Sequence, residues 1–521
     1  MLEQGRSYDD LVAGFDWALP ARLNMAQQVC DDWAARDGTR LAILDLSDGA
    51  ALRVTYADLQ RMADGLAHLL AARGVARGDR VGVLRSQSAW TAAAHIAIWK
   101  LGAVSIPLFK LFGTDALRTR LTDAGARLVV TDPEGVVLLH GFDLEALVPE
   151  GMTLPEGAFP ITDTGPDDPA VLIYTSGTTG APKGALHGHR ILTGHLPGVE
   201  ISHDLLGQGG DCLWTPADWA WIGGLFDVLM PGLALGVPVV AARMAKFSVA
   251  ECQDVIARGG VRNVFFPPTA LRMLKAADAV IPGLRSVASG GEPLGAEMLD
   301  WGRRAFTLTI NEFYGQTECN MVASSCSALF SPHPGFIGRA VPGFDVAVID
   351  DQGHVTTGEG DIAIRRGAAS MMLGYWNRPD ATAEKFRGDW MLTGDRGVIK
   401  DGFIRFVGRE DDVITSSGYR IGPAEIEDGL LTHPAVATVG VVGKPDPLRT
   451  EIVKAYVVLK PGFTPSDALA TELVQHIKTR VAQHAYPREI GFLDALPMTV
   501  TGKVIRKDLK ARATRERESA T

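Results

Sequence analysis

A glycine-rich segment of the sequence carries the residue types that bind polyphosphate. Residues 174–184 read YTSGTTGAPKG and directly follow the apolar run AVLIY. Glycines permit positive φ and a close approach of the backbone to a ligand, hydroxyl groups donate hydrogen bonds to phosphate oxygens, and Lys183 adds a cation. We therefore expect a phosphate-binding loop, with contacts from Thr175, Ser176, Gly177, Thr178, Thr179, Gly180 and Lys183.

The spacing of this loop excludes a Walker A motif. Counting from Gly177, Pro182 rather than glycine precedes Lys183, so the pattern GxxxxGK[ST] fails. A flexible surface turn is the other alternative, but the whole segment has the composition that phosphate binding needs. The segment instead resembles the signature of the ANL superfamily of adenylate-forming enzymes, which includes acyl-CoA synthetases, luciferases and peptide-synthetase adenylation domains. The resemblance extends from about Ala35 to Lys507 and is closest to medium-chain acyl-CoA synthetases.

The resemblance implies the rest of an ATP site. Residues 312–318, EFYGQTE, resemble the family motif whose aromatic residue stacks on adenine and whose Thr317 and Glu318 face the phosphates and a magnesium ion. Mg²⁺ prefers oxygen ligands, so the Glu318 carboxylate and the ATP phosphates suit it. SGGEP at 289–293 resembles the adenine-pocket segment, with a plain turn as the alternative, and Asp395 in TGD would accept hydrogen bonds from both ribose hydroxyls. The remaining residues assigned to ATP are Gly291, Glu292, Pro293, Glu312, Phe313, Tyr314, Gly315 and Gln316.

The C-terminal part supplies a second set of implied site residues. Residues 408–427 resemble the family's crossover into its C-terminal domain, with Arg409 near ribose and phosphate and Asp411 at the hinge about which that domain rotates. Lys503, at the end of PMTVTGK, resembles the catalytic lysine of the family. Attack of a carboxylate on the α-phosphate builds up negative charge, which an ammonium stabilises. Catalysis is thus assigned to Lys503, Glu318 and Thr317.

The thiol and acid sites are also implied by the resemblance. The residues assigned to coenzyme A are Ser417, Gly418, Tyr419, Arg420, Arg449, Tyr486, Pro487 and Arg488. Arginine forks suit its phosphates, although a solvated surface arginine is an equal alternative for Arg449. The acyl pocket is expected at Trp219, Trp221 and Gly223 in WTPADWAWIGG, although aromatic clusters more often form core. Acetyl- and propionyl-CoA synthetases resemble this chain but carry tryptophan at the position of Gly315, so we expect space here for a medium-chain, branched or aryl acid.

Alternating elements must position these residues. Short apolar runs alternate with helical periodicities from Leu41 to Asp132, and a second such series runs from Ala170 to Phe330, which predicts two α/β layers with largely parallel sheets. Short runs bounded by glycine predict an antiparallel β unit from Pro342 to Val407. Beyond it, helices near 423–431 and 466–482, two strands and a terminal strand predict a small α+β domain that ends in a frayed basic tail from Lys510.

The expected fold class is therefore α/β. A large N-terminal AMP-binding domain, residues 1–407, would combine βα-layered subdomains with the β unit, and a smaller, mobile α+β domain, residues 408–521, would carry the catalytic lysine. The chain has 521 residues and a formal charge of −10, which disfavours nucleic acid and anionic lipid as partners.

Compartment and assembly are less constrained. The longest apolar stretch is interrupted by Asp227, Pro231 and Pro238, so no integral membrane segment is expected, and the N-terminus does not resemble a secretory signal. Five scattered cysteines lack metal-ligand spacing and favour the cytoplasm. The sequence does not fix an oligomeric state, and a homodimer is one of the options.

These observations predict an ATP-dependent acid:CoA ligase. It would form an acyl-adenylate from a small carboxylic acid and ATP, with Mg²⁺ and release of pyrophosphate, and then transfer the acyl group to coenzyme A with release of AMP. The alternative is a stand-alone adenylation enzyme that loads the thiol of a carrier protein. A luciferase-type oxygenation has no positive support, and intact Lys503, Glu318 and Asp395 weigh against a non-enzymatic nucleotide sensor.

Overall fold

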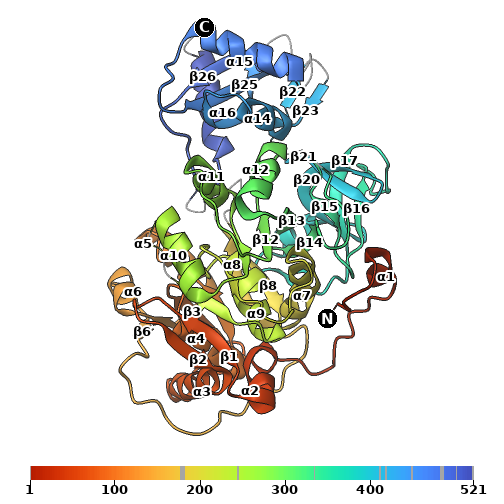
Figure 1. Cartoon of the computed structure of the whole chain (residues 1–521). Coiled ribbons are helices and arrows are strands. Elements are labelled where there is room, and N and C mark those ends of the chain that lie inside the picture. Colours follow the sequence, from red (N-terminus) through yellow and green to blue (C-terminus); the bar gives the residue numbers. More distant parts are fainter. Residues whose placement is uncertain are drawn as a thin grey trace.

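The protein consists of a large α/β N-terminal domain and a smaller α+β C-terminal domain at one end of it (Figure 1). The computed structural model describes residues 2–175, 182–242, 244, 246–333, 335–409, 412, 414–416, 419–446, 450–480, 486–499 and 502–518. At 415, 419, 420, 425, 450, 479, 480 and 518 it describes the backbone alone. The predicted fold class is confirmed.

A seven-stranded sheet holds the hairpin around the glycine-rich segment. Its strand order is β18-β8-β7-β4-β3-β5-β6. The central strands pair in parallel, whereas β7 and β8 form an antiparallel hairpin in which Thr175 lies opposite Lys183. The strands are β3 (Arg80–Leu84), β4 (Val104–Pro107), β5 (Leu128–Thr131), β6 (Glu145–Leu147), β7 (Pro169–Thr175), β8 (Lys183–Gly188) and β18 (Gly374–Tyr375).

A fourteen-stranded sheet carries most of the other site residues, in the order β16-β17-β20-β21-β15-β14-β13-β12-β11-β9-β10-β1-β2, with β19 on β20. Neighbouring strands pair in parallel along β10-β9-β11-β12-β13 and antiparallel along β13-β14-β15-β21. The predicted antiparallel β unit therefore continues the α/β sheet. The strands are β1 (Leu41–Asp45), β2 (Leu52–Thr55), β9 (Leu213–Trp214), β10 (Val239–Ala241), β11 (Asn263–Phe265), β12 (Ser286–Gly290), β13 (Ile310–Gln316), β14 (Cys319–Ser324), β15 (Gly338–Ala340), β16 (Val346–Ile349), β17 (Gly360–Arg365), β19 (Phe386–Arg387), β20 (Trp390–Lys400) and β21 (Phe403–Arg409).

The two layers expected from the sequence do not follow the order of the chain. β1 pairs with β10 rather than joining β3, and β7 pairs with β4 rather than β11, so each sheet draws strands from both series. Apolar periodicity identifies strands but not their partners, which explains the difference.

Helices fill and cover the two sheets. α4 and α7 are buried along almost their whole length and share one apolar cluster with η2, as expected of helices that are apolar on all sides. The Thr55–Asp58 capping box starts α3. The N-terminal helices are α1 (Tyr8–Ala13), η1 (Gln27–Asp31), α2 (Asp32–Asp37), α3 (Tyr56–Ala72), α4 (Ala89–Lys100), α5 (Thr114–Ala124), α6 (Pro133–Leu138), α7 (Arg190–Ser202), α8 (Ile222–Gly224), η2 (Leu225–Leu229), α9 (Met230–Leu235), α10 (Val249–Gly259), α11 (Pro268–Ala276), α12 (Ala296–Phe306) and α13 (Pro379–Glu384). Among the described residues, none of the helices combines the length and apolar character that crossing a membrane requires.

The C-terminal domain, blue in Figure 1, is built on a five-stranded sheet above α11 and α12. Its strands are β22 (Ile414–Ser416), β23 (Tyr419–Ile421), β24 (Val436–Asp446), β25 (Thr450–Leu459) and β26 (Glu489–Phe492), and its helices are α14 (Pro423–Leu431), α15 (Asp467–Arg480) and α16 (Arg506–Glu518). The expected frayed tail is wrong as far as Glu518, because α16 buries Leu509 and Ala513 against Val442 and Tyr456. The domain boundary at 407/408 and the mobility of this domain stay predictions.

Candidate active site

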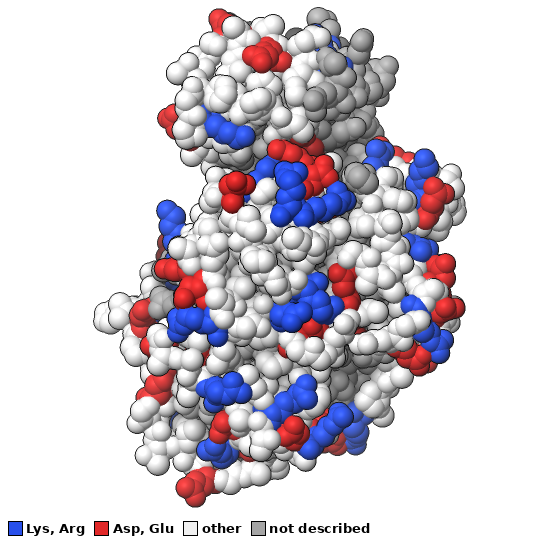
Figure 2. Space-filling view, viewed as in Figure 1, with Lys and Arg blue, Asp and Glu red and all other residues white. Residues whose placement is uncertain are grey.

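A cavity of about 2460 Å³ lies where the two domains meet, and Figure 2 shows basic and acidic side chains gathered at this junction. Residues from both domains line it, including Pro423 and Glu427 of α14. Most of the residues predicted for ATP binding and catalysis are brought together here, namely Thr175, Lys183, Gly291, Glu292, Pro293, Glu312, Phe313, Tyr314, Gly315, Gln316, Thr317, Glu318, Asp395, Arg409 and Lys503.

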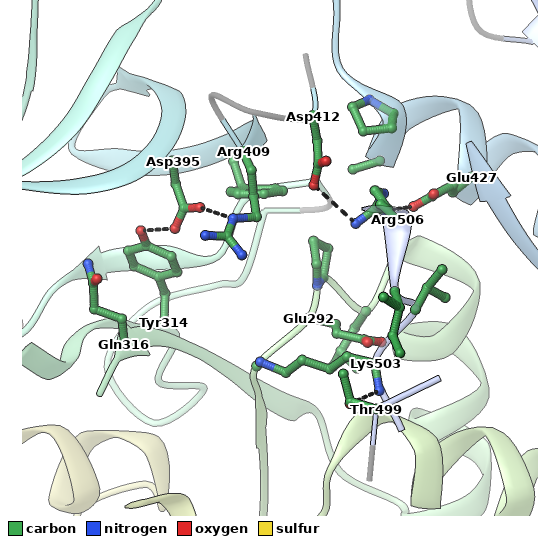
Figure 3. Close-up of a pocket in the computed structure, with 18 of the residues that line it drawn as sticks. Glu292, Tyr314, Gln316, Asp395, Arg409, Asp412, Glu427, Thr499, Lys503 and Arg506 are labelled. Carbon is green, nitrogen blue, oxygen red and sulfur yellow. Dashed lines mark hydrogen bonds and ion pairs between the residues drawn. The ribbon is translucent and has the colours of Figure 1, made fainter. Parts of the chain in front are cut away.

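Three of these residues, which lie on β13, β20 and β21 of the large sheet, form a connected group (Figure 3). The Tyr314 hydroxyl on β13 donates to Asp395 Oδ2 at 2.5 Å. The register of β20 and β21 places Asp395 opposite Arg409, whose Nε lies 3.9 Å from Asp395 Oδ1. Burial raises the pKa of Asp395, and the Tyr314 hydrogen bond and the Arg409 charge oppose this increase. The group offers a carboxylate acceptor beside a cation.

Thr317 and Glu318 form the turn between β13 and β14. Glu318 is only 8% exposed, and the hydroxyl of Tyr375 donates to its Oε1. β18 pairs with β8, so Tyr375 also lies beside Lys183, whose Nζ is 5.3 Å from the centre of the tyrosine ring. Sequence reasoning missed Tyr375, because nothing in its local sequence indicates a contact with a carboxylate 57 positions away.

The single carboxylate of Glu318 suits a metal ion whose other ligands come from a bound substrate. In the described part of the chain, no group of three or more histidine, cysteine, aspartate or glutamate side chains could hold a metal ion. Mg²⁺ commonly keeps several waters and binds through one or two carboxylates together with substrate phosphates. A single carboxylate at Glu318 therefore fits Mg²⁺ that arrives with ATP.

The loop that carries Lys503 reaches the cavity from the C-terminal domain. A bridge between Met498 and Val504 closes the loop, and the Lys503 amide donates to Thr499 Oγ1 at 3.0 Å. From there the side chain extends past Glu292 towards the side of the cavity that holds Tyr314 and Gln316 (Figure 3). A Cβ added to Gly291 would lie 3.7 Å from Lys503 Nζ, so the ammonium sits against the backbone of the SGGEP segment.

The surroundings of Lys503 disfavour its charged form. The residue keeps solvent contact through the cavity, but crowding by protein desolvates the ammonium and lowers its pKa, and Arg409 acts in the same direction. Glu292 opposes this decrease, and Arg272 pairs with Glu292 at 2.7 Å. A cation whose charge is only partly compensated is suited to meeting a negatively charged ligand.

An ion-pair network anchors the end of the lysine loop within its own domain. Arg506 donates to Glu427 and lies 3.8 Å from Asp412 (Figure 3). Lys510 lies 3.1 Å from the same aspartate. Sequence reasoning missed this network. Its only signal was the position of Arg506 three residues after Lys503.

Trp221 and Lys503 both lie close to Gly291. The Trp221 ring lines the cavity and lies 3.8 Å from the point where a Cβ on Gly291 would stand. A Cβ on Gly223 would lie only 2.7 Å from the Trp221 ring, so glycine lets that ring lie flat against the chain. Trp219, which we also expected in the acyl pocket, is fully buried in the core and does not line the cavity.

A side chain at Gly315 would meet close neighbours on the following strand. Gly315 lies at an irregularity between β13 and β14, and a Cβ added there would lie 2.4 Å from Asn320 Oδ1 and 2.5 Å from the Met321 amide nitrogen. The volume that a side chain at 315 would enter is thus already filled by Asn320 and Met321. Gly315 itself lines the cavity, so its assignment to the acyl pocket stays a prediction, although the sequence does not reveal how closely the following strand approaches.

The residues assigned to coenzyme A lie apart from the cavity where they are described. The centre of the Tyr486 ring lies 4.2 Å from Lys478 Nζ and 4.9 Å from Arg488 Cζ, and Pro487 is buried. None of the assigned residues Tyr486, Pro487 and Arg488 lines the cavity. For Tyr419 and Arg420 only the β23 backbone is described. The other assigned positions, Ser176, Gly177, Thr178, Thr179, Gly180, Asp411, Ser417, Gly418 and Arg449, lie outside the described residues.

Comparison with known proteins identifies the family that this site and fold define. The family model described as AMP-binding enzyme matches residues 30–376, and the model of the AMP-binding enzyme C-terminal domain matches residues 425–503. The chain therefore belongs to the AMP-binding enzymes of the ANL superfamily. Within it, the curated relatives are acyl-CoA synthetases, so the chain is an enzyme of the AMP-forming ligase class.

Relatives and solved structures match over almost the whole chain. Acetyl-coenzyme A synthetase from Bacillus subtilis is 33% identical, over 97% of this chain and 95% of that protein. The mitochondrial acyl-coenzyme A synthetase ACSM2 of Rattus norvegicus is 34% identical, over 95% of this chain and 92% of that protein. An acyl-CoA synthetase structure from Brucella canis has a TM-score of 0.74 and 34% identity, covering 98% of this chain and 99% of that one. The anthranilate CoA ligase AuaEII, solved with anthranoyl-AMP, has a TM-score of 0.86 and 25% identity, covering 97% and 100%.

Proposed function

We propose that this chain converts a carboxylic acid and ATP into an acyl-adenylate and then into an acyl-CoA, with release of pyrophosphate and AMP. The main support is that Lys503 of the C-terminal domain lines the same cavity as Thr317, Glu318, Asp395 and Arg409 of the N-terminal domain. These groups supply a cation for the reacting phosphate, a carboxylate for a metal and a carboxylate for ribose hydroxyls.

The first half-reaction uses the arrangement in which Lys503 reaches the cavity. The substrate carboxylate attacks the α-phosphorus and pyrophosphate leaves, while the Lys503 ammonium stabilises the charge that builds up between two anions. Asp395 and Arg409 orient the ribose, and Thr317 binds phosphate oxygens. Glu318 together with those oxygens would hold Mg²⁺, which would offset the charge on the polyphosphate.

The second half-reaction forms the thioester. A thiol attacks the acyl carbon of the adenylate and AMP leaves. The family resemblance implies that the C-terminal domain first rotates about Asp411, which removes Lys503 and admits the thiol. That the assigned residues Tyr486 and Arg488 lie outside the present cavity is consistent with such a rotation.

The acid we propose is medium-chain, branched or aryl. Apolar side chains line part of the cavity, among them Phe109, Phe112, Ile173, Trp221 and Phe313. One structural relative is an anthranilate CoA ligase, whose acid is aromatic, whereas one sequence relative is an acetyl-CoA synthetase. Because an added Cβ at Gly315 would meet Asn320 and Met321, the main support for an acid larger than acetate comes from this apolar lining.

The acceptor we propose is coenzyme A, with a separate carrier protein as the alternative. An amide bond synthetase among the structural neighbours, at 24% identity, shares the fold alone. For the compartment we propose the cytoplasm, supported by five cysteines that are all free. Competition between coenzyme A and a phosphopantetheinyl carrier for the acyl-adenylate would decide between the acceptors.

A panel of acids scored by AMP release, with and without coenzyme A, tests the proposal. We expect AMP release that depends on both acid and coenzyme A, with acids of about six carbons or benzoate preferred over acetate, because each additional buried methylene contributes about 0.8 kcal/mol. Lys503→Ala is the control and should lose acid-dependent pyrophosphate exchange. Preference for acetate would contradict the proposed acid class. An equal rate of AMP release with and without coenzyme A would contradict the proposed acceptor.

A further inference from the structure

A second lysine lines the cavity from the N-terminal domain. Lys385 directly follows α13, and its carbonyl accepts a hydrogen bond from the Leu392 amide at 2.8 Å. The next residues form β19, which pairs with β20, the strand that carries Asp395. Lys385 is therefore fixed to the same element as the carboxylate that we assign to the ribose.

Within the described residues, the ammonium of Lys385 contacts two neutral oxygens and no charged one. Its Nζ donates to Gln316 Oε1 at 2.9 Å and to the Thr393 carbonyl at 3.3 Å. In the described part of the chain no carboxylate lies within 4.0 Å of this nitrogen. An ammonium has three N–H donors, so one donor remains for another acceptor.

Lys385 also determines how Gln316 presents its amide. A lysine ammonium has no acceptor, so it requires the oxygen of the Gln316 amide to face it and the nitrogen to face away. The other contact is equally fixed, because Thr393 is buried and its hydroxyl donates to the Ile362 carbonyl at 2.7 Å. The position of the ammonium is therefore well defined.

Lys385 lies near both carboxylates of the site, because its two hydrogen-bond acceptors belong to Gln316, two residues before Glu318, and to Thr393, two residues before Asp395. Burial lowers the pKa of Lys385, Glu318 and Asp395 oppose this decrease, and Arg409 and Lys183 add to it. Partial burial of a cation without a paired anion is unfavourable, and an anionic ligand relieves it. The space between a ribose-binding and a phosphate-facing carboxylate is where the α-phosphate of a bound nucleotide would lie.

We propose that Lys385 is a nucleotide-binding residue that donates its remaining N–H to the α-phosphate of ATP and then to the phosphate of the acyl-adenylate and AMP. This inference rests on the proposed function. Lys385 belongs to the N-terminal domain together with Asp395, whereas Lys503 belongs to the C-terminal domain. Lys385 therefore keeps its contact in both half-reactions, and Lys503 acts in the first alone.

Full-length variants test this division. Lys385→Met removes the ammonium, and Lys385→Gln keeps hydrogen-bond donors for Gln316 and Thr393 without the charge. Lys400→Met changes an exposed lysine at the end of β20, the strand that carries Asp395, and serves as a matched control. AMP binding is measured by titration calorimetry. Acid-dependent pyrophosphate exchange and thiolysis of a synthetic acyl-adenylate report the two half-reactions.

We expect both Lys385 variants to weaken AMP binding by about tenfold or more, as the loss of a charge-assisted hydrogen bond does, and to slow both half-reactions. Lys503→Ala should slow exchange alone, and Lys400→Met should match the wild type. AMP affinity within about twofold of the wild type in Lys385→Gln would overturn the inference. A wild type without acid-dependent exchange would instead contradict the proposed function, while its AMP affinity would still test Lys385.

Discussion

Asn320 connects the turn of Thr317 and Glu318 to helix η2. Its Nδ2 lies 2.9 Å from each carboxylate oxygen of Asp227 on η2, and His195 Nδ1 lies 3.0 Å from the same carboxylate. All three side chains are buried, so removing one leaves polar atoms without partners.

We expect Asn320→Ala to lower the free energy of unfolding by about 1.5–3 kcal/mol, the range for a hydrogen bond to a charged group. Urea denaturation followed by tryptophan fluorescence measures this change. Gln253→Ala, which removes an exposed amide on α10, should change the free energy by less than about 0.5 kcal/mol. Equal effects of the two substitutions would show that the buried network contributes nothing specific.

Glu312 is a buried carboxyl whose ionisation opposes folding. Burial raises its pKa to about 8, and the nearby Asp428 of the C-terminal domain adds to the increase. An acid with a higher pKa in the folded state loses stability as pH rises from its unfolded pKa to its folded one. That window runs from the ordinary glutamate pKa of 4.5 to about 8.

Glu312→Gln should therefore flatten the decrease of stability between pH 5 and 8, since each pKa unit corresponds to about 1.4 kcal/mol. Thermal unfolding of wild type and variant across this range measures the effect. Glu297→Gln on the exposed start of α12 serves as the control and should leave the slope unchanged. Parallel pH profiles for wild type and Glu312→Gln would contradict the raised pKa.

At this scale the sequence indicated the motif residues but not their partners. Thr317, Asp395 and Lys503 stand in short motifs, and the structure brings them into one cavity. Lys385 and Tyr375 stand outside those motifs, and their contacts with Gln316 and Glu318 join residues 69 and 57 positions apart. Such contacts depend on strand pairing, which residue types and spacing do not reveal.

At the scale of elements, the sequence did not predict helix α16, because its apolar pattern is short. α14 and α15 were expected close to their observed bounds, but α16 has a strongly polar sequence, RKDLKARATRERE. Leu509 and Ala513 are four residues apart and therefore share one helical face, which packs on Val442, Tyr456 and Leu496. Two apolar positions are too few for a periodicity to stand out.

Leu509→Ala should destabilise the C-terminal domain by about 2–4 kcal/mol, the usual cost of truncating a buried leucine. Hydrogen exchange of residues 506–518 measures the loss of protection. Lys507→Ala, on the exposed face of the same helix, should leave exchange almost unchanged. Unaltered protection in Leu509→Ala would mean that α16 does not depend on this contact.

At the scale of the whole molecule, the active site is complete only when the two domains meet. Gly502, next to Lys503, has φ of +80°, and a Cβ added to it would lie 2.6 Å from Thr269 Cγ2 on α11. The lysine loop thus docks on the N-terminal domain through a contact that has room for glycine alone. The family of the chain and its α/β class could be predicted from sequence, whereas this docking contact depends on the placement of two separate domains.

Gly502→Ala should slow acid-dependent pyrophosphate exchange by about tenfold or more, because it combines a clash with backbone strain of about 1–2 kcal/mol and each 1.4 kcal/mol corresponds to tenfold in rate. Thiolysis of a presynthesised acyl-adenylate should change little, since that step does not need Lys503 in the cavity. Adding Thr269→Ser removes the methyl group that the new Cβ would meet, so the double variant should recover part of the lost exchange, with the backbone strain accounting for the remainder. Equal losses in both half-reactions, or no recovery in the double variant, would show that the contact between Gly502 and α11 does not control adenylation.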